Sequence, residues 1–414
     1  MRTRNANQRI LISGAGIAGL SLAYWLRLYG FTPTLVEKAP SIRQGGYKVD
    51  IRGKALEVIQ RMGLYAKISD AKTDMQGASI VDRNGKLITQ MSGDTFGVRV
   101  AEDLEIMRGD LCQILWGHIQ GIECLFNDSV NSVKQVGEEV QVTFESHTSR
   151  SFDSVIGADG LHSNIRELVF GDDLPFLREL GLYISIFTIP NFLNLDRWEV
   201  EYSEPGKLVN LYSSRGDAHA RAAFLFSSKP LGLSPSDTES QHKVLHDVYD
   251  SIGWEIPKLL AAMKETPDFY FDSVTQVCMH HWASHRVCLL GDAGYCPSPV
   301  SGQGTSLALV GAYVLAGELA AAHGDHTIAF KNYEKQLQKY VLKNQKLGQI
   351  VAKILNGANK KTLAIWLHDL FMQIMPGQWI NFTKNKAVQQ VNRAANAIKL
   401  KDYRAYLNDD SSMR

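Results

Sequence analysis

The sequence predicts an α/β protein in which a βαβ unit opens the chain, a mixed β-sheet is inserted in the middle and helices form the C-terminal part. Three observations carry this prediction. An apolar strand, a helical stretch and a second strand follow one another at the start, alternating apolar and polar segments fill the middle, and helical periodicity runs from Phe330 onward. The 414 residues, 45% apolar and 21% charged, suit a folded protein of two or three domains rather than a disordered or fibrous one.

The first strand is expected over 10–13, the helix over 17–28 and the second strand over 32–36. Three arginines precede the apolar run 10–26, which superficially resembles a secretory signal. That run contains three spaced glycines and leads through Gly30 into the second strand. We therefore interpret it as folded structure.

Further strands and helices follow from apolar periodicity and turn residues. Strands are expected over 78–81 and 86–89 around the turn 82–85, and over 140–144, 151–156, 208–212, 222–226 and 286–290. Helices are expected over 109–119 and 307–319. The second of these is shorter than the ~20 residues of a membrane span and contains Glu318, so it is predicted to be a buried helix.

These elements group into three units. The first is a discontinuous nucleotide-binding domain over 1–76, 101–178 and 273–325. A substrate-binding domain is expected over 77–100 and 179–272, and C-terminal helices over 326–414. We expect a monomer.

Charge and cysteine content narrow the partners. Lysine and arginine number 44 against 43 acidic residues, so no overall field favours nucleic acid or an anionic membrane. The five cysteines are scattered and never in CxxC spacing, which predicts a cytoplasmic protein without a disulfide framework or a zinc site. His280 and His281 lack further ligands at suitable spacing, so no metal is expected.

A glycine motif follows the first strand. Gly14, Gly16 and Gly19 fit GxGxxG, in which the glycines permit a tight turn, close approach of a pyrophosphate and close helix packing. Glu37 ends the next strand, where a carboxylate accepts both ribose hydroxyls of a dinucleotide. Because strand, helix and acidic residue all match, we favour a Rossmann-like dinucleotide site over a simple glycine-rich turn.

Two later segments, 153–166 and 286–304, resemble the further fingerprints of the class A flavoprotein monooxygenases, the FAD-dependent aromatic hydroxylases. Physically, Asp292 at a strand end can accept a hydrogen bond from a ribityl hydroxyl, and the loop 297–304 directs a helix N-terminus to a point that suits an anion. The resemblance implies FAD as cofactor. The cofactor-binding residues it implies are Gly46, Asp50, Arg108, Asp159, Gly291, Asp292, Pro299, Gly302 and Gly304, with Arg52 guiding the nicotinamide cofactor.

From Arg9 to Tyr406 the chain also resembles the tetracycline destructases, through segments 45–53, 93–97, 187–190, 268–272 and 291–304. This resemblance implies that NADPH reduces FAD, that O2 forms a C4a-hydroperoxyflavin, and that an oxygen atom passes to a tetracycline and inactivates it. No catalytic side chain is expected, because the flavin carries the chemistry. Gly294-Tyr295 and Thr305 depart from the Ala-His and Asn that are common among the hydroxylases.

Substrate contacts are expected from the second domain and the wall of the 297–304 loop. Aromatic rings would stack on a planar polycycle and an arginine would meet its ionised oxygens, although a core role is open for each aromatic residue. The predicted substrate-binding residues are Phe96, Phe187, Tyr212, Arg221, Phe224, Pro299 and Gly302.

Near the C-terminus, Val388, Val391, Ala395 and Ile398 form an apolar stripe among basic residues, which predicts an amphipathic helix over about 384–406. The destructase resemblance implies that this helix bridges the domains as a lid over the substrate entrance. A permanent brace is the alternative. Membrane binding is less favoured, because the apolar face lacks tryptophan or phenylalanine anchors.

Three functions follow from the sequence. The first is a tetracycline-inactivating monooxygenase that uses FAD, NAD(P)H and O2. The second is a class A hydroxylase of another aromatic or polyketide substrate. The third is an FAD-containing electron-transfer or binding protein that transfers no oxygen.

Overall fold

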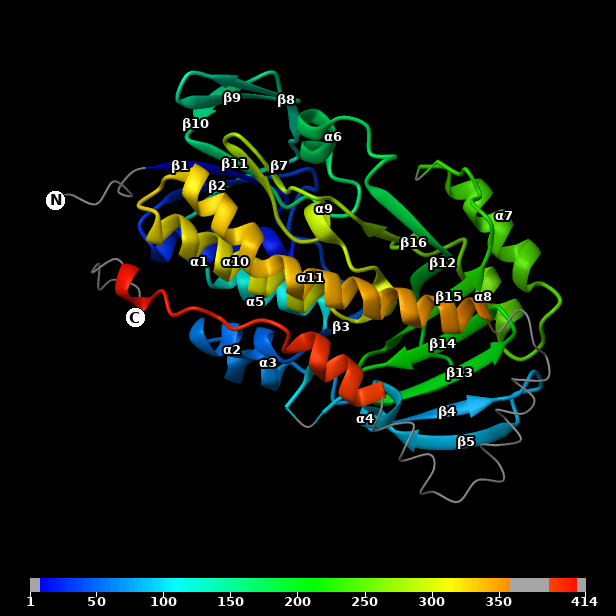
Figure 1. The fold of residues 1–414 in the computed structure, drawn as a ribbon. Helices are drawn as coiled ribbons and strands as arrows, with labels where there is room; N and C mark the ends of the chain where they lie inside the picture. The colour runs from blue at the N-terminus through cyan, green and yellow to red at the C-terminus, as the bar shows by residue number, and fades with distance from the viewer. Residues whose placement is uncertain (1–7, 101, 235, 358–386, 408–414) are drawn as a thin grey trace.

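The structure is a computed structural model that describes residues 8–100, 102–234, 236–357 and 387–407 (Figure 1). The bounds of the opening βαβ unit agree closely with the sequence prediction. β1 (Arg9–Ser13), α1 (Ile17–Leu28) and β2 (Thr32–Glu37) follow one another, and the central residues of both strands are buried. The apolar N-terminal run is therefore folded structure, as predicted.

β1 lies inside a six-stranded sheet. Its order is β17-β18-β11-β1-β2-β7, and every pair except β17-β18 is parallel. The remaining strands are β7 (Glu123–Phe126), β11 (Ser154–Gly157), β17 (Ala283–Ser284) and β18 (Val287–Leu289). Parallel strands carry their following loops at one edge, so the glycine loop after β1 lies beside the loops after β11 and β18.

Helices and a small sheet cover the two faces of the six-stranded sheet. α1, α10 (Gly304–Ala321) and α11 (His326–Gly357) pack together on one side, and the three-stranded sheet β10-β9-β8 lies on the other (Figure 1). The small sheet contains β8 (Val130–Val136), β9 (Glu139–Phe144) and β10 (Ser149–Phe152).

The strand predicted over 151–156 is wrong in one respect, because this segment forms two strands in different sheets. Phe152 ends β10 and pairs with Val140, whereas Ser154 begins β11 and pairs with Ile10. Asp153 lies between them and accepts the Arg9 backbone N–H at 2.7 Å. Apolar periodicity does not register a change of pairing partner, so the sequence showed one strand.

The middle of the chain forms a seven-stranded sheet in the order β16-β12-β15-β14-β13-β4-β5. It contains β4 (Gly77–Val81), β5 (Leu87–Ser92), β12 (Leu177–Pro190), β13 (Trp198–Glu204), β14 (Lys207–Ser213), β15 (His219–Ser227) and β16 (Tyr270–Val277). One face packs on α7 (Thr238–Tyr249) and α8 (Ile256–Ala262) in a separate apolar core. Residues of the other face, among them Glu199, Asn210 and Tyr212, line a cavity together with residues of the loops after β1 and β18.

Short elements join the two large sheets. β3 (Lys48–Ile51) and β6 (Leu104–Met107) form an antiparallel pair, and α5 (Arg108–Gly117) starts directly after β6. The other short elements are α2 (Lys54–Arg61), α3 (Tyr65–Asp70), α4 (Gly93–Phe96), α6 (Asn164–Phe170), α9 (Asp292–Tyr295) and the 3₁₀ turns η1 (Pro299–Ser301) and η2 (Arg404–Tyr406). The β3-β6 pair positions several polar side chains of the site.

The helix predicted over 307–319 is buried, as expected. It is α10, which is long and apolar enough to cross a membrane by composition alone, but 89% of it is buried inside the protein. It packs between α1, α2 and α11. These are the surroundings of a core helix.

The predicted C-terminal helix is shorter than expected. Residues 387–395 are helical, but the chain is irregular from 397 to 403, and 384–386 lie outside the described residues. The irregular part is anchored on the first domain, because Tyr403 donates a hydrogen bond to Glu318 at 2.6 Å and the Lys401 carbonyl accepts one from Tyr313 at 2.7 Å. These tertiary contacts replace the helical hydrogen bonds expected over this part, and the choice between a lid and a brace stays a prediction.

Candidate active site

A cavity of about 520 Å³ lies between the first domain and the bare face of the seven-stranded sheet. A volume in this range suits a drug-sized ligand. The glycine loop, β3, β6, the Pro297–Gly304 loop and strands β12 to β15 all contribute to its wall. Ten of the predicted site residues line it: Gly16, Asp50, Phe96, Arg108, Tyr212, Phe224, Asp292, Pro299, Gly302 and Gly304.

Gly14 and Gly19 shape the turn between β1 and α1 rather than lining the cavity. Gly14 has φ +102°, and its N–H donates to the Val36 carbonyl at 2.8 Å. A Cβ on Gly19 would lie 1.9 Å from the Gly14 carbonyl oxygen, so no larger residue fits. Gly16 stands as N-cap of α1, lines the cavity, and leaves space beside the Arg108 guanidinium.

The start of α1 is open to an anion. The helix has no side-chain cap and no acidic residue in its first turn, so its first N–H groups lack intrahelical partners. Arg108, the first residue of α5, places its guanidinium 3.8 Å from the position that a Cβ on Gly16 would take. Gly46, with φ +96°, lies against the Arg108 side chain. Backbone donors and one cation thus converge where a pyrophosphate is expected.

Glu37 and Asp159 are placed beside this loop but do not line the cavity. Glu37 accepts the Ala15 N–H at 2.9 Å and the Ala39 N–H at 3.0 Å, so it braces the glycine loop while keeping lone pairs for a ribose. Asp159 is enclosed by Ser163 and Ile165 at the start of α6. Its contacts make Asp159 a brace for the α6 N-terminus, and burial raises its pKa.

A second helix N-terminus faces the cavity at Gly304. α10 begins there without a side-chain cap or a first-turn acidic residue. Asp292 Oδ1 lies 3.8 Å, and Asp50 Oδ2 3.6 Å, from the positions that a Cβ on Gly304 and on Gly302 would take. Burial raises the pKa of Asp292, whereas its hydrogen bond with Cys296 and the Arg108 charge lower it. Gly291, with φ +68°, holds α9 against Ala18 of α1.

Several buried polar atoms near this point lack hydrogen-bond partners among the described residues. They include Asp50 Oδ1, Ser298 Oγ and both amide atoms of Gln303. A buried polar atom without a partner is costly, so these atoms favour a polar ligand. Together with two uncapped helix N-termini, they fit the pyrophosphate and the polar ring edge of FAD.

Arg52 is not positioned to guide a nicotinamide cofactor. Its side chain is 5% exposed, it pairs with Asp50 at 2.9 Å, and its guanidinium donates to the Gly97 and Val98 carbonyls at 2.8 Å each. These contacts hold the turn after α4 against β3. The sequence could not separate this buried structural arginine from an exposed binding one.

On the substrate side, Phe96 of α4 and Tyr212 of β14 both line the cavity. The Tyr212 hydroxyl accepts the Lys48 backbone N–H at 3.2 Å, and the Lys48 ammonium lies 4.7 Å from the Tyr212 ring centre. Arg221 lies opposite Tyr212 on β15 but does not line the cavity, and it pairs with Asp217 at 3.5 Å.

Phe187 and Phe224 belong mainly to the core behind the sheet. Their rings stack at 5.6 Å and are almost fully buried against α7 and α8. Phe224 contributes to the cavity wall, whereas Phe187 does not. The expectation that Phe187 stacks on a substrate therefore conflicts with its place on the core face of β12, whereas Phe224 borders both the core and the cavity.

Sequence reasoning missed a buried charged group on the cavity floor. Lys48 forms ion pairs with Glu199 and with Glu105, the latter at 3.6 Å. Glu105 also meets Arg99 at 2.6 Å, and although burial opposes ionisation, Lys48 and Arg99 lower the pKa of Glu105. Glu201 and Asn210 complete this part of the wall. Glu199 and Glu201 stand two residues apart, and that spacing on a strand could have indicated two carboxyls on one face.

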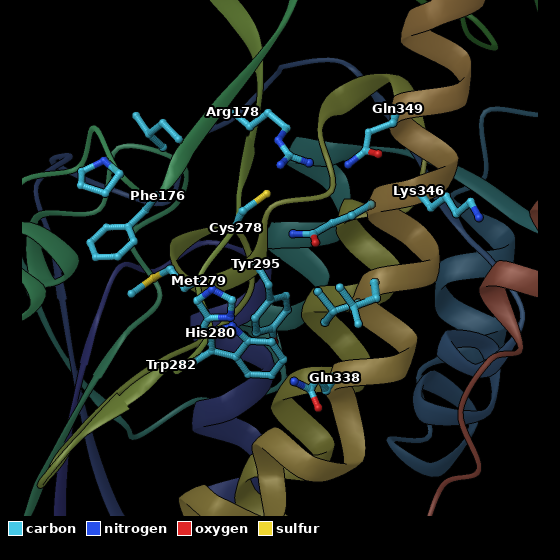
Figure 2. A pocket seen from close by; sticks show the side chains of 15 residues that line it. Phe176, Arg178, Cys278, Met279, His280, Trp282, Tyr295, Gln338, Lys346 and Gln349 are labelled. Carbon is cyan, nitrogen blue, oxygen red and sulfur yellow. The ribbon is translucent and has the colours of Figure 1, made fainter.

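A second pocket of about 900 Å³ is lined by residues from the start of β12, from the segment 278–282 and from α11 (Figure 2). Trp282 and Tyr295 form its aromatic wall, and α11 contributes Gln338, Lys346 and Gln349. None of the predicted site residues lines it. Within the described part of the chain, no group of three or more histidine, cysteine, aspartate or glutamate residues could hold a metal ion.

Comparisons with known proteins identify the family of the chain. Residues 7–336 match the family described as FAD binding domain. A flavin-dependent monooxygenase of Legionella longbeachae is 40% identical over 399 residues, 96% of this chain and 98% of that protein. An uncharacterized protein of Mycobacterium tuberculosis is 46% identical over 339 residues, 81% of this chain and 91% of that protein. The structure of tetracycline destructase Tet(51) superimposes with a TM-score of 0.84 at 38% identity, covering 96% of this chain and 100% of that one.

Proposed function

The chain belongs to the FAD binding domain family and is an FAD-dependent monooxygenase, and from that premise we propose that it oxidises tetracycline antibiotics, and so inactivates them, with NAD(P)H and O2. The observation that carries the proposal is the shared cavity. One side presents two uncapped helix N-termini, and the other presents a sheet face with Tyr212 and Phe96. The similarity to tetracycline destructase Tet(51) along nearly the whole chain supports the choice of substrate.

The residues of the first domain would hold FAD. The first turn of α1 and Arg108 would bind the pyrophosphate, and Glu37 would accept the ribose hydroxyls. Asp292 would accept a ribityl hydroxyl, and Asp50 would meet the polar edge of the ring through Oδ1, which accepts no hydrogen bond and lies 3.9 Å from the Arg99 guanidinium. Bound FAD supplies the activation of O2 and the transfer of one oxygen atom.

Besides holding FAD, the protein would position the substrate and exclude water from the cavity. The α10 N-terminus carries a partial positive charge that would stabilise negative charge on a ligand bound beside Gly302–Gly304. Tyr212 and Phe96 would both contact a planar polycycle. A tetracycline is an enol and already nucleophilic, so no strongly basic side chain is needed to activate it.

The decisive experiment mixes the yellow purified protein with NADPH and a tetracycline. We expect the near-ultraviolet absorbance of the antibiotic to fall and its product to gain one oxygen atom. If several tetracyclines are not consumed and NADPH consumption depends on a different aromatic compound, the substrate is not a tetracycline but belongs to the class of that compound. NADPH consumption without any oxygenated product would refute oxygen transfer.

A further inference from the structure

Two carboxyl groups, from Glu199 and Glu201, lie on the cavity face of β13, and they differ in their side-chain partners. Glu199 and Glu201 alternate with Val200 and Tyr202, which pack into the core on the other face. Both glutamates line the cavity, and Asn210 of β14 lies opposite Glu201 in the register. Apolar residues of the same face, Leu208 and Leu225, surround them.

Glu199 already has its partners. Its carboxylate forms an ion pair with Lys48 and accepts a hydrogen bond from the Asn210 amide at 3.3 Å. Lys48 is engaged further by Glu105 at 3.6 Å. The Glu201 side chain, in contrast, forms no hydrogen bond or ion pair with any residue in the described part of the chain, although the backbone of Glu201 is paired in the sheet. Its polar atoms therefore face the cavity rather than a protein partner.

The charges around the cavity favour a cationic group beside Glu201. Five carboxyls line the cavity, from Asp50, Glu105, Glu199, Glu201 and Asp292, against two cations, Lys48 and Arg108. Lys48 is the cation on the β13 side, and two carboxylates neutralise it. Arg99 pairs with Glu105 and does not line the cavity.

Burial raises the pKa of Glu201 to about 7, with a further contribution from the charge of Glu199 and a partly compensating one from Lys48. A cation beside the carboxylate would lower that pKa again, because it favours the ionised form. A ligand with an ammonium group would therefore be bound together with release of a proton from Glu201 near neutral pH.

We propose that Glu201 is a specificity-determining residue that binds a protonated amine of the substrate through an ion pair in the cavity. This inference rests on the proposed function, and it identifies the protonated amine as the part of the substrate that Glu201 recognises. Tetracyclines carry a dimethylamino group that is protonated at neutral pH, and their 4-dedimethylamino derivatives lack it. Glu201 then separates amine-bearing polycycles from otherwise similar ones that have no cation.

The test compares wild-type holoenzyme with Glu201→Gln, using tetracycline and 4-dedimethylaminotetracycline as probes. Binding is followed through the change in flavin fluorescence on titration. An ion-paired hydrogen bond contributes enough that we expect the variant to bind tetracycline about tenfold to a hundredfold more weakly, with less than about a twofold change for the derivative. The wild type should also bind tetracycline more tightly as pH rises from about 6 to about 8, and the variant should lose this dependence.

Glu204→Gln is the matched control. Glu204 lies on the same strand but on the core face, where it accepts the Tyr202 hydroxyl at 2.8 Å, so it should change neither affinity. FAD content and the flavin spectrum of Glu201→Gln should match the wild type, which separates lost recognition from lost folding.

Each other outcome decides between the two proposals. The role of Glu201 is overturned if Glu201→Gln binds both probes more weakly by the same factor, or if its affinity for tetracycline is unchanged. In either case, turnover of tetracycline by the wild type would still support the proposed function. Failure of the wild type to bind either probe refutes the tetracycline assignment, and the role of Glu201 then falls with it.

Discussion

The two sides of the cavity are built in different ways. On the first-domain side, the groups available to a ligand are mostly backbone N–H groups at the N-termini of α1 and α10. The side chains of Arg108, Asp50 and Asp292 lie beside glycines that leave room for a ligand. On the sheet side, the wall is made of side chains from strands β12 to β15 and from β3, including a buried ion-paired group. A backbone site is tied to short local motifs, whereas a side-chain wall depends on how distant strands align.

This difference predicts that glycine changes abolish cofactor binding. Gly19→Ala would place a Cβ 1.9 Å from the Gly14 carbonyl oxygen and force the β1–α1 turn apart. We expect at least about a tenfold loss of bound FAD per protein, measured by visible flavin absorbance, because overpacking a tight turn displaces the phosphate-binding backbone. Gly117→Ala, which meets no atom within 4 Å, is the control. Full FAD content in Gly19→Ala would contradict the backbone account.

A charge deletion sharpens the same comparison with a smaller effect. Arg108→Ala removes the cation beside Gly16, and we expect FAD affinity to fall about tenfold or more, since charge-assisted contacts to phosphate are strong. Arg178→Ala, in the second pocket, should leave FAD affinity unchanged. Reconstitution of apoprotein with FAD measures both, and equal affinities for the two variants would remove Arg108 from the phosphate site.

On the sheet side, changes should affect the substrate and spare the cofactor. Phe96→Ala should raise KM for tetracycline about tenfold at normal FAD content, because an aromatic contact is lost from the cavity. Phe187→Leu, behind the sheet, should instead lower the free energy of unfolding by about 1–2 kcal/mol with little change in KM. A larger KM effect for Phe187→Leu than for Phe96→Ala would reverse the assignment of the two faces.

The smallest expected effect concerns the pH dependence of stability. The pKa of Glu201 is raised from 4.5 to about 7, so its contribution to stability is present below 4.5 and is lost as pH rises through about 7. Relative to the wild type, Glu201→Gln should therefore gain at least about 1 kcal/mol of stability as pH is raised from about 5 to about 8. Denaturant unfolding of ligand-free protein measures this, and a pH-independent difference would show that Glu201 titrates normally.

The same division explains what the sequence could predict. The opening βαβ unit was predicted within one residue, because strand, glycine turn and helix are adjacent in the chain. The residues around Gly16, Asp50, Arg108 and Asp292 were expected near a cofactor, and the structure brings them to one cavity. FAD as cofactor and the monooxygenase class agree with the family match, while the role of each residue stays a prediction.

On the sheet wall, sequence reasoning was less successful for a physical reason. Phe187 and Phe224 are aromatic residues on strands, but which face they occupy depends on the register of β12 and β15, and they occupy the core face. Lys48, Glu105 and Glu199 meet only because β3, β6 and β13 come together in space. No local pattern reports such a meeting, so this charged group went unpredicted.

The central claim is that one cavity holds FAD on its first-domain side and a tetracycline against its sheet wall. The most direct measurement is the mass of the product formed from tetracycline, NADPH and isotopically labelled O2 by the purified holoenzyme. The account predicts a product that contains one oxygen atom from the labelled gas. Tetracycline recovered unchanged, or modified with oxygen from water alone, would contradict it.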